Sequence, residues 1–172
     1  MKLLLMSAPA TSTFCLRISE VLHSSSSSWT RPANLPRGWR SALRQILPAL
    51  SVVIGVRLRL TFSSLKDVRL RMLPQPLRER RVDLVAVARL AWAVRVAARL
   101  VPFASCLTQA QACQILLARQ GYPSTLCLGV RQTSAGQVRA HAWLTCANAM
   151  VVGGDAEVVA QFRPIARLPP VA

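Results

Sequence analysis

The stretch that decides the fold spans residues 105–123 and reads SCLTQAQACQILLARQGYP. Ser105 is a residue type that often caps the start of a helix, because its hydroxyl accepts a hydrogen bond from a free backbone N–H. Gly121 and Pro123 are typical of the end of a helix. The sequence therefore predicts a helix over residues 105–120 with Cys106 in its first turn.

A cysteine in the first turn of a helix is well placed for catalysis. The aligned peptide dipoles and the free N–H groups there favour a thiolate and can hold an oxyanion. Cys113 lies in the middle of the same helix, and Cys127 and Cys146 lie on predicted strands, so we expect these three to pack. With Cys15, the chain has five cysteines, and none of them forms a C-x-x-C pair. This number and spacing favour neither a disulfide framework nor a zinc site. We expect no metal, no other cofactor and a reducing, cytoplasmic setting.

The neighbouring elements follow from apolar spacing. Residues 83–104 carry apolar side chains three and four residues apart, which indicates an amphipathic helix. Short apolar runs predict strands over residues 126–132 and 137–146, and a third from near Met150. The predicted fold class is therefore α+β, with N-terminal helices packed on a short antiparallel sheet.

The first half of the chain divides into two segments. Residues 1–40, with a serine run at 24–28, are predicted to be disordered or to follow a start codon assigned too early. Residues 41–82 are predicted to be a basic helical lead-in that Pro48 interrupts. The longest apolar run of this lead-in is shorter than the ~18 residues that a membrane span needs. Such a basic amphipathic helix packs on its own domain, on a membrane surface or on a partner.

The charge of the chain limits its partners. Its 22 lysines and arginines against 6 acids give a net charge of +16. This excess suits nucleic acid, an anionic membrane or an acidic protein segment, although GC-rich genes also produce arginine-rich chains. We expect no nucleic acid, because the chain has no base-reading motif and only 5% aromatic residues for stacking.

His141 lies on the predicted strand of residues 137–146, with Trp143 two residues further on the same face. An indole beside the imidazole would shield it from water. The position of Asp155 depends on the turn that follows this strand. A three-residue turn places Asp155 opposite His141, with Cβ atoms roughly 5 Å apart. A two-residue turn would place Gly154 there and send Asp155 to the other face.

Cys106, His141 and Asp155 follow one another in the order nucleophile, base and orienter. We predict that His141 accepts the thiol proton and that Asp155 holds the imidazole ring. The alternatives are a histidine satisfied within the core and an aspartate solvated in a loop.

Several short motifs carry a resemblance to a known family. They are Arg99-Leu100-Val101-Pro102, Ser105-Cys106-Leu107, residues 116–123, Leu128-Gly129-Val130, Ala140-His141-Ala142-Trp143 and residues 161–166. In this order they resemble the leader peptidases of lasso-peptide biosynthesis, which are transglutaminase-like cysteine peptidases of the microcin-processing type. The resemblance covers nearly half of the chain, from about Val87 to Leu168. It implies a papain/transglutaminase-like peptidase domain over residues 83–172.

The resemblance also implies a function. A peptidase of this family removes the leader from a ribosomally made precursor, with the cysteine matching Cys106 as nucleophile and the histidine matching His141 as its base. Asp155 is the nearest match to the third catalytic residue. The family often has an acidic residue after His-Ala-Trp, where this chain has Leu144 and Thr145. The implied partners are the precursor peptide, a separate leader-recognition protein and an ATP-dependent cyclase. The recognition protein is expected to be separate because residues 1–80 show no winged-helix pattern.

Two other functions fit the same residues. A transglutaminase-like acyltransferase would use the same three residues but transfer the acyl group to an amine instead of water. A basic membrane- or nucleic-acid-associated binding protein would make no use of them. Steep salt dependence of binding would favour the second.

Overall fold

The computed structural model describes residues 39–74 and 80–169, all within one compact unit of residues 31–172. Its elements are α2 (Trp39–Phe62), α3 (Leu65–Met72), α4 (Leu84–Leu100), α5 (Cys106–Arg119), β1 (Thr125–Gln132), β2 (Val138–Cys146), β3 (Ala149–Val152), α6 (Ala156–Ala160) and β4 (Arg163–Leu168). The prediction for residues 1–40 falls almost wholly outside the described residues, because α2 begins at Trp39.

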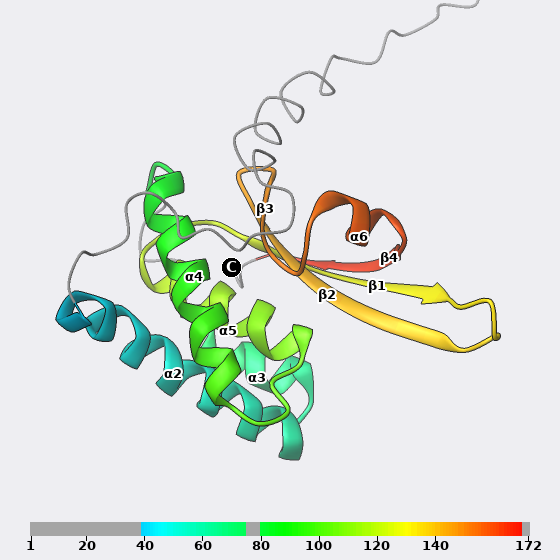
Figure 1. The fold of residues 1–172 in the computed structure, drawn as a ribbon, viewed down its shortest axis with the longest axis horizontal. Coiled ribbons are helices and arrows are strands. Elements are labelled where there is room, and N and C mark those ends of the chain that lie inside the picture. Colours follow the sequence, from blue (N-terminus) through cyan, green and yellow to red (C-terminus); the bar gives the residue numbers. More distant parts are fainter. Residues whose placement is uncertain (1–38, 75–79, 170–172) are drawn as a thin grey trace, which may run out of the picture. The chain divides into compact units, whose positions relative to one another are not determined.

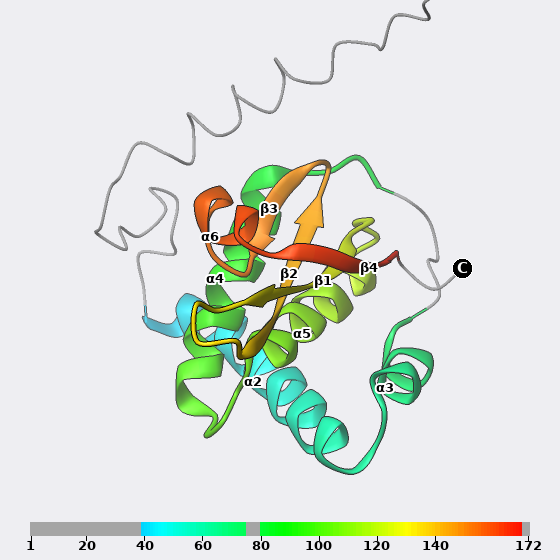
Figure 2. The same cartoon turned by 90° about the vertical axis from the view of Figure 1, so that its right-hand side faces the viewer.

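The strands form one antiparallel sheet in the order β3-β2-β1-β4. The helices α2, α4 and α5 lie on one side of this sheet (Figures 1 and 2). Of these, α5 and α4 contact the strands, and α2 packs on α4 and α5. The predicted α+β class, with helices that precede a short antiparallel sheet, is confirmed. The sequence analysis did not foresee α6 or β4.

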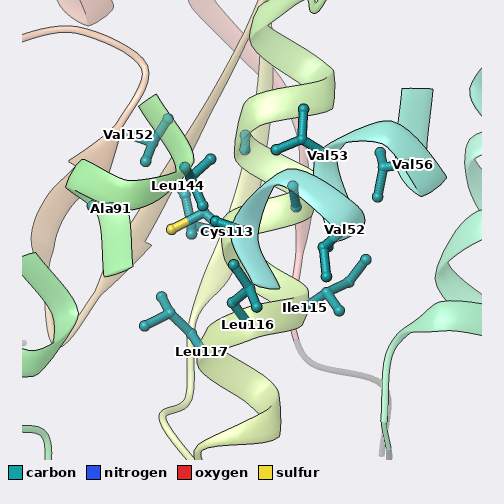
Figure 3. Close-up of a cluster of buried hydrophobic side chains, with 14 of the residues drawn as sticks. Val52, Val53, Val56, Ala91, Cys113, Ile115, Leu116, Leu117, Leu144 and Val152 are labelled. Carbon is teal, nitrogen blue, oxygen red and sulfur yellow. The ribbon is translucent and has the colours of Figure 1, made fainter. Parts of the chain in front are cut away.

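Helix α5 is the central element of the core. Its N-cap is Ser105, whose side chain accepts from the N–H of Thr108, as the sequence predicted. Every residue from Ala110 to Leu117 is buried, so the helix is enclosed on all sides over two turns. Figure 3 shows Cys113 of this helix among apolar side chains that include Leu144 and Val152 of the sheet.

Helix α4 covers α5 and also follows its prediction. Asp83 caps its start, because the carboxylate accepts from the N–H groups of Val85 and Ala86. The face that the helix buries consists of small and branched apolar residues: Val87, Ala91, Ala93, Val94, Ala97 and Ala98. Small side chains allow the two helices to approach closely.

Helix α2 departs from its prediction. It continues through Pro48 as a single helix instead of starting afresh there. Ala42–Phe62 is consequently long and apolar enough to cross a membrane by length and composition alone, whereas the sequence analysis placed this region below that limit. In the structure one face of α2 packs on α4 and α5, so the predicted lead-in shares the core of the domain.

A polar network ties the end of the sheet to the helices. The buried side chain of Gln114 donates to the carbonyls of Ser124 and Leu168, each at 3.1 Å. Arg69 of α3 donates to the Gln114 amide oxygen at 2.8 Å and to the carbonyl of Pro169. Since both side chains are buried, each needs these partners to offset lost hydration.

Candidate active site

Cys106 is the first residue of α5 and is only partly buried. The other described cysteines, Cys113, Cys127 and Cys146, are buried, as predicted. Burial raises the pKa of the Cys113 thiol to about 12, and it also raises the pKa values of Cys127 and Cys146. Among the described cysteines, Cys106 is therefore the one that a substrate can reach.

His141 lies on β2 beside two aromatic rings. Ala142 and Leu144 point into the core, so His141 and Trp143, which alternate with them, lie on the other face of the sheet. The imidazole is 6.2 Å from the Trp143 ring and 4.9 Å from the Phe162 ring, centroid to centroid. Trp143 was predicted as a neighbour, whereas Phe162 could not be, because α6 and the turn after it were not foreseen.

A backbone carbonyl fixes the orientation of the imidazole. Nε2 of His141 lies 2.6 Å from the carbonyl oxygen of Gly153. A carbonyl oxygen can only accept, so Nε2 donates and carries the hydrogen. In the neutral ring Nδ1 is then the unprotonated nitrogen, which is the form that a general base requires.

Gly153 can hold this position only because it has no side chain. Its φ is +115°, a conformation that L residues other than glycine rarely adopt. A Cβ atom at this residue would lie 2.4 Å from the Cβ of Trp143 and 2.6 Å from its Cα. The glycine therefore lets the backbone pass directly over Trp143 and reach the neighbouring imidazole.

The β2–β3 connection combines the two turns that the sequence left open. It is a two-residue turn, Ala147-Asn148, with φ of +48° and +63°. The pairing starts as Cys146↔Ala149 and shifts by one residue before Leu144↔Val152. This shift restores the alignment that a three-residue turn would give, but β3 ends at Val152, before the alignment reaches Asp155.

Asp155 is exposed and lies at the start of α6. Its carboxylate accepts from the N–H of Val158 at 3.1 Å and caps this short helix. It follows Gly153 by two residues, and the hydrogen bond that the structure gives His141 goes to Gly153 instead. A direct bond from Asp155 to the imidazole stays a prediction.

The three predicted residues are not joined to one another. Within residues 39–74 and 80–169, no hydrogen bond connects Cys106 with His141 or either of them with Asp155. Cys106 packs against the helix side of the core, and the imidazole lies on the opposite face of β2. The last β2–β3 pair is Leu144↔Val152, so His141 lies beyond the stretch that β3 covers.

Comparison with protein families matches residues 50–167 to the transglutaminase-like superfamily. The match covers more than half of the 172 residues and includes all three predicted site residues. The chain belongs to this superfamily. The searches of curated proteins and of solved structures gave no match.

The transglutaminase-like match begins inside α2, which agrees with the position of that helix in the core. The superfamily indicates chemistry of the cysteine peptidase or acyltransferase type. Within the transglutaminase-like domain, α5 supplies the candidate nucleophile and β2 the candidate base.

The segment after α6 forms the outer wall of the histidine site in this transglutaminase-like domain. The Arg131 guanidinium lies 5.1 Å above the Phe162 ring and donates to the side-chain oxygen of Gln161. These contacts link β1 to the turn before β4. They hold Phe162 against His141, so that the Phe162 ring shields one face of the imidazole from water.

Proposed function

We propose that this protein is a cysteine peptidase that removes the leader from a lasso-peptide precursor. The superfamily match supports the class of chemistry, and the order of the short motifs supports the leader peptidase. The observation that carries the proposal is the bond from His141 Nε2 to Gly153, which leaves Nδ1 ready to accept a proton.

In this mechanism the Cys106 thiolate attacks the carbonyl carbon of the peptide bond between leader and core. The first-turn N–H groups of α5 stabilise the oxyanion that forms. The imidazolium of His141 protonates the leaving amine, so the leader remains as a thioester on Cys106. Water, deprotonated by His141, then hydrolyses the thioester and restores the free thiol.

The mechanism requires the thiol and the imidazole to meet. Because the thiol and the imidazole lie on different sides of β2, substrate binding has to bring them together. The start of α5, with Cys106, must therefore approach the segment of β2 that carries His141 and has no partner in β3. A His141→Cys variant tests this approach, because a disulfide with Cys106 forms only if the two Cα atoms come within about 7 Å. Formation of this disulfide under oxidising conditions, with or without precursor, would show that the two residues come close enough to react.

The proposed partners are those that the leader peptidase needs. They are the precursor peptide, a separate protein that recognises the leader, and an ATP-dependent cyclase that closes the ring on the freed core. All of these would act in the cytoplasm.

A cleavage assay tests the proposal directly. The protein, the precursor and the recognition protein are incubated, and the products are identified by mass spectrometry. Cys106→Ala is expected to abolish the free leader and core, whereas Cys113→Ala, on the same helix but buried, is expected to retain cleavage. Cleavage that persists in Cys106→Ala would exclude Cys106 as the nucleophile.

The superfamily match equally supports an acyltransferase. The two reactions share the thioester and differ in whether water or an amine attacks it. Adding a primary amine to the same assay separates them. A precursor that gains the mass of the amine at a Cys106-dependent site, without free leader, would replace the peptidase with the acyltransferase.

A further inference from the structure

The outer face of α2 carries a continuous row of large apolar side chains. They are Leu43, Leu47, Ile54, Leu58 and Phe62, with exposed fractions of 41%, 58%, 41%, 56% and 84%. Their spacings of four and seven residues place them on one side of the helix, and we call this set the α2 stripe. At about 1.5 Å per residue the stripe extends for roughly 30 Å.

The α2 stripe lies opposite the face that the helix uses in the fold. The buried residues of α2 are Ala49, Val52, Val53 and Val56, which contact the core. Val56 follows Leu47 by nine residues, which is about half a turn out of phase at 100° per residue. Helix α2 is thus apolar both toward the core and away from it, a pattern that indicates a second apolar environment outside the domain.

Arginines flank the α2 stripe. Arg44 and Arg59 are exposed beside it, Arg57 is half-buried, and α2 contains neither aspartate nor glutamate. The chain as a whole carries a net charge of +16. The surface that covers the α2 stripe is therefore expected to be apolar in its interior and negatively charged at its boundary.

The apolar surface continues onto the connection between α4 and α5. A hollow of about 350 Å³ lies between the second half of α2 and the end of α4. It is lined by Ile54, Arg57, Leu58, Thr61, Leu100, Val101 and Pro102. Leu100 is 63% exposed, and Phe103 is 85% exposed with a φ of +58°. Phe103 precedes Cys106 by three residues, so this surface lies close in sequence to the candidate nucleophile.

We propose that the α2 stripe, with Leu100 and Phe103, docks this protein on an anionic lipid bilayer, with α2 lying in the plane of the interface. A row of protruding apolar side chains can insert between lipids. A partner helix would need a groove along the whole row, and the hollow beside α2 reaches only its second half, at Ile54, Leu58 and Thr61. The flanking arginines attract the anionic headgroups. The proposal goes beyond leader removal, because it states where the enzyme works.

Vesicle binding tests the docking surface on the full-length chain. The protein is sedimented with two kinds of vesicle. One is pure phosphatidylcholine, and the other also contains roughly 30% phosphatidylglycerol, an anionic lipid whose surface charge attracts basic segments. We expect binding only to the anionic vesicles, and weaker binding as salt is raised. The double variant Leu47→Glu/Leu58→Glu is expected to bind at least about tenfold more weakly, because it places charge in the inserted face.

The matched control is Val138→Glu/Ile165→Glu. These residues are 71% and 63% exposed on β2 and β4, so the control adds the same charge to exposed apolar positions outside the α2 stripe. It is expected to bind as the unchanged protein does. Circular dichroism melting of both variants checks that neither has lost its fold.

Three outcomes would overturn the proposal. Equal loss of binding in the two double variants would indicate a general effect of charge. A change of oligomeric state in Leu47→Glu/Leu58→Glu alone, measured by light scattering without lipid, would assign the α2 stripe to a second copy of the chain. Resistance of the bound protein to alkaline carbonate extraction would indicate a spanning helix. Cys106→Ala is expected to bind normally, so failure of the docking surface and of the peptidase are separate results.

Discussion

Helices α5 and α2 are both rich in apolar residues, but the fold uses them differently. The centre of α5 is enclosed on every side, whereas α2 buries one face and leaves an equally apolar face in solvent. A hydrophobic helix therefore indicates burial only when neighbouring elements exist to cover all of its faces. Helix α5 forms the centre of the core and carries the candidate nucleophile, whereas α2 is available for contact with another surface.

The largest expected difference between the two helices is in stability. Ile115→Ala on α5 removes a side chain that is 0% exposed and should destabilise the protein by about 2–5 kcal/mol. Leu58→Ala on α2, where the side chain is 56% exposed, should change stability by less than about 0.5 kcal/mol. Urea denaturation followed by circular dichroism measures both. Similar losses would show that the face of α2 is covered in solution.

The next largest effect concerns the backbone that holds the imidazole. Gly153→Ala should reduce cleavage by about 100-fold, because the new Cβ displaces the carbonyl from His141 by an ångström or more. Gly136→Ala is the control, since its φ is also positive, at +76°, but a Cβ there contacts nothing within 4 Å.

The ¹⁵N shifts of the His141 ring give a reading that does not depend on activity. They should report hydrogen on Nε2 in the unchanged protein, and Gly153→Ala should alter them. Asp155→Asn should leave them unaltered if the carbonyl is the partner of the ring. A tautomer that changes in Asp155→Asn would transfer the orienting role to Asp155.

A smaller effect is expected from the polar network behind α5. Arg69→Ala leaves the Gln114 oxygen buried without its charged donor, which should destabilise the fold by about 1.5–3 kcal/mol. Arg71, exposed on the same helix, provides the control, and Arg71→Ala should be nearly neutral. Equal melting temperatures for the two variants would show that Arg69 contributes little.

The two cysteines of α5 are expected to differ in reactivity. Iodoacetamide at neutral pH should modify Cys106 well before Cys113, because burial raises the pKa of Cys113 to about 12. In the unfolded chain the ordinary pKa of a cysteine thiol, 9.0, applies to Cys113, so stability should decrease as pH rises from there toward about 12. Denaturation across this range measures the slope, which Cys113→Ala should reduce. Modification of Cys113 at the rate of Cys106 would mean that α5 opens readily.

Much of the fold was predictable because local chemistry and tertiary packing agree. Ser105 and the breakers Gly121 and Pro123 defined α5, and short apolar runs defined β1 and β2. The disagreements have physical causes. α2 runs through Pro48 because packing of its inner face outweighs the local penalty. Helix α6 is too short to produce a periodic pattern of apolar residues. Its N-cap, Asp155, is also a residue type that can orient a catalytic histidine, so the sequence favoured that role over capping.

The candidate site was only partly predictable. The place of Cys106 followed from its helix, and the neighbourhood of Trp143 followed from strand alternation. The hydrogen-bond acceptor for His141 could not be predicted, because it is the main-chain carbonyl of Gly153 and no pattern of side chains indicates its position. Its position depends on a one-residue shift in the β2–β3 ladder, which the sequence left undecided.

The Gly153 carbonyl has an evolutionary consequence. An orienting carboxylate can be lost by a single base change, but every amino acid brings a main-chain carbonyl. Mutation at residue 153 therefore cannot delete the acceptor and can only move it, through the contact with Trp143. The orientation of the imidazole is protected against loss of a functional group and exposed to changes in backbone shape. Variation in this protein should accordingly change the proposed activity in steps, through residues that contact Trp143.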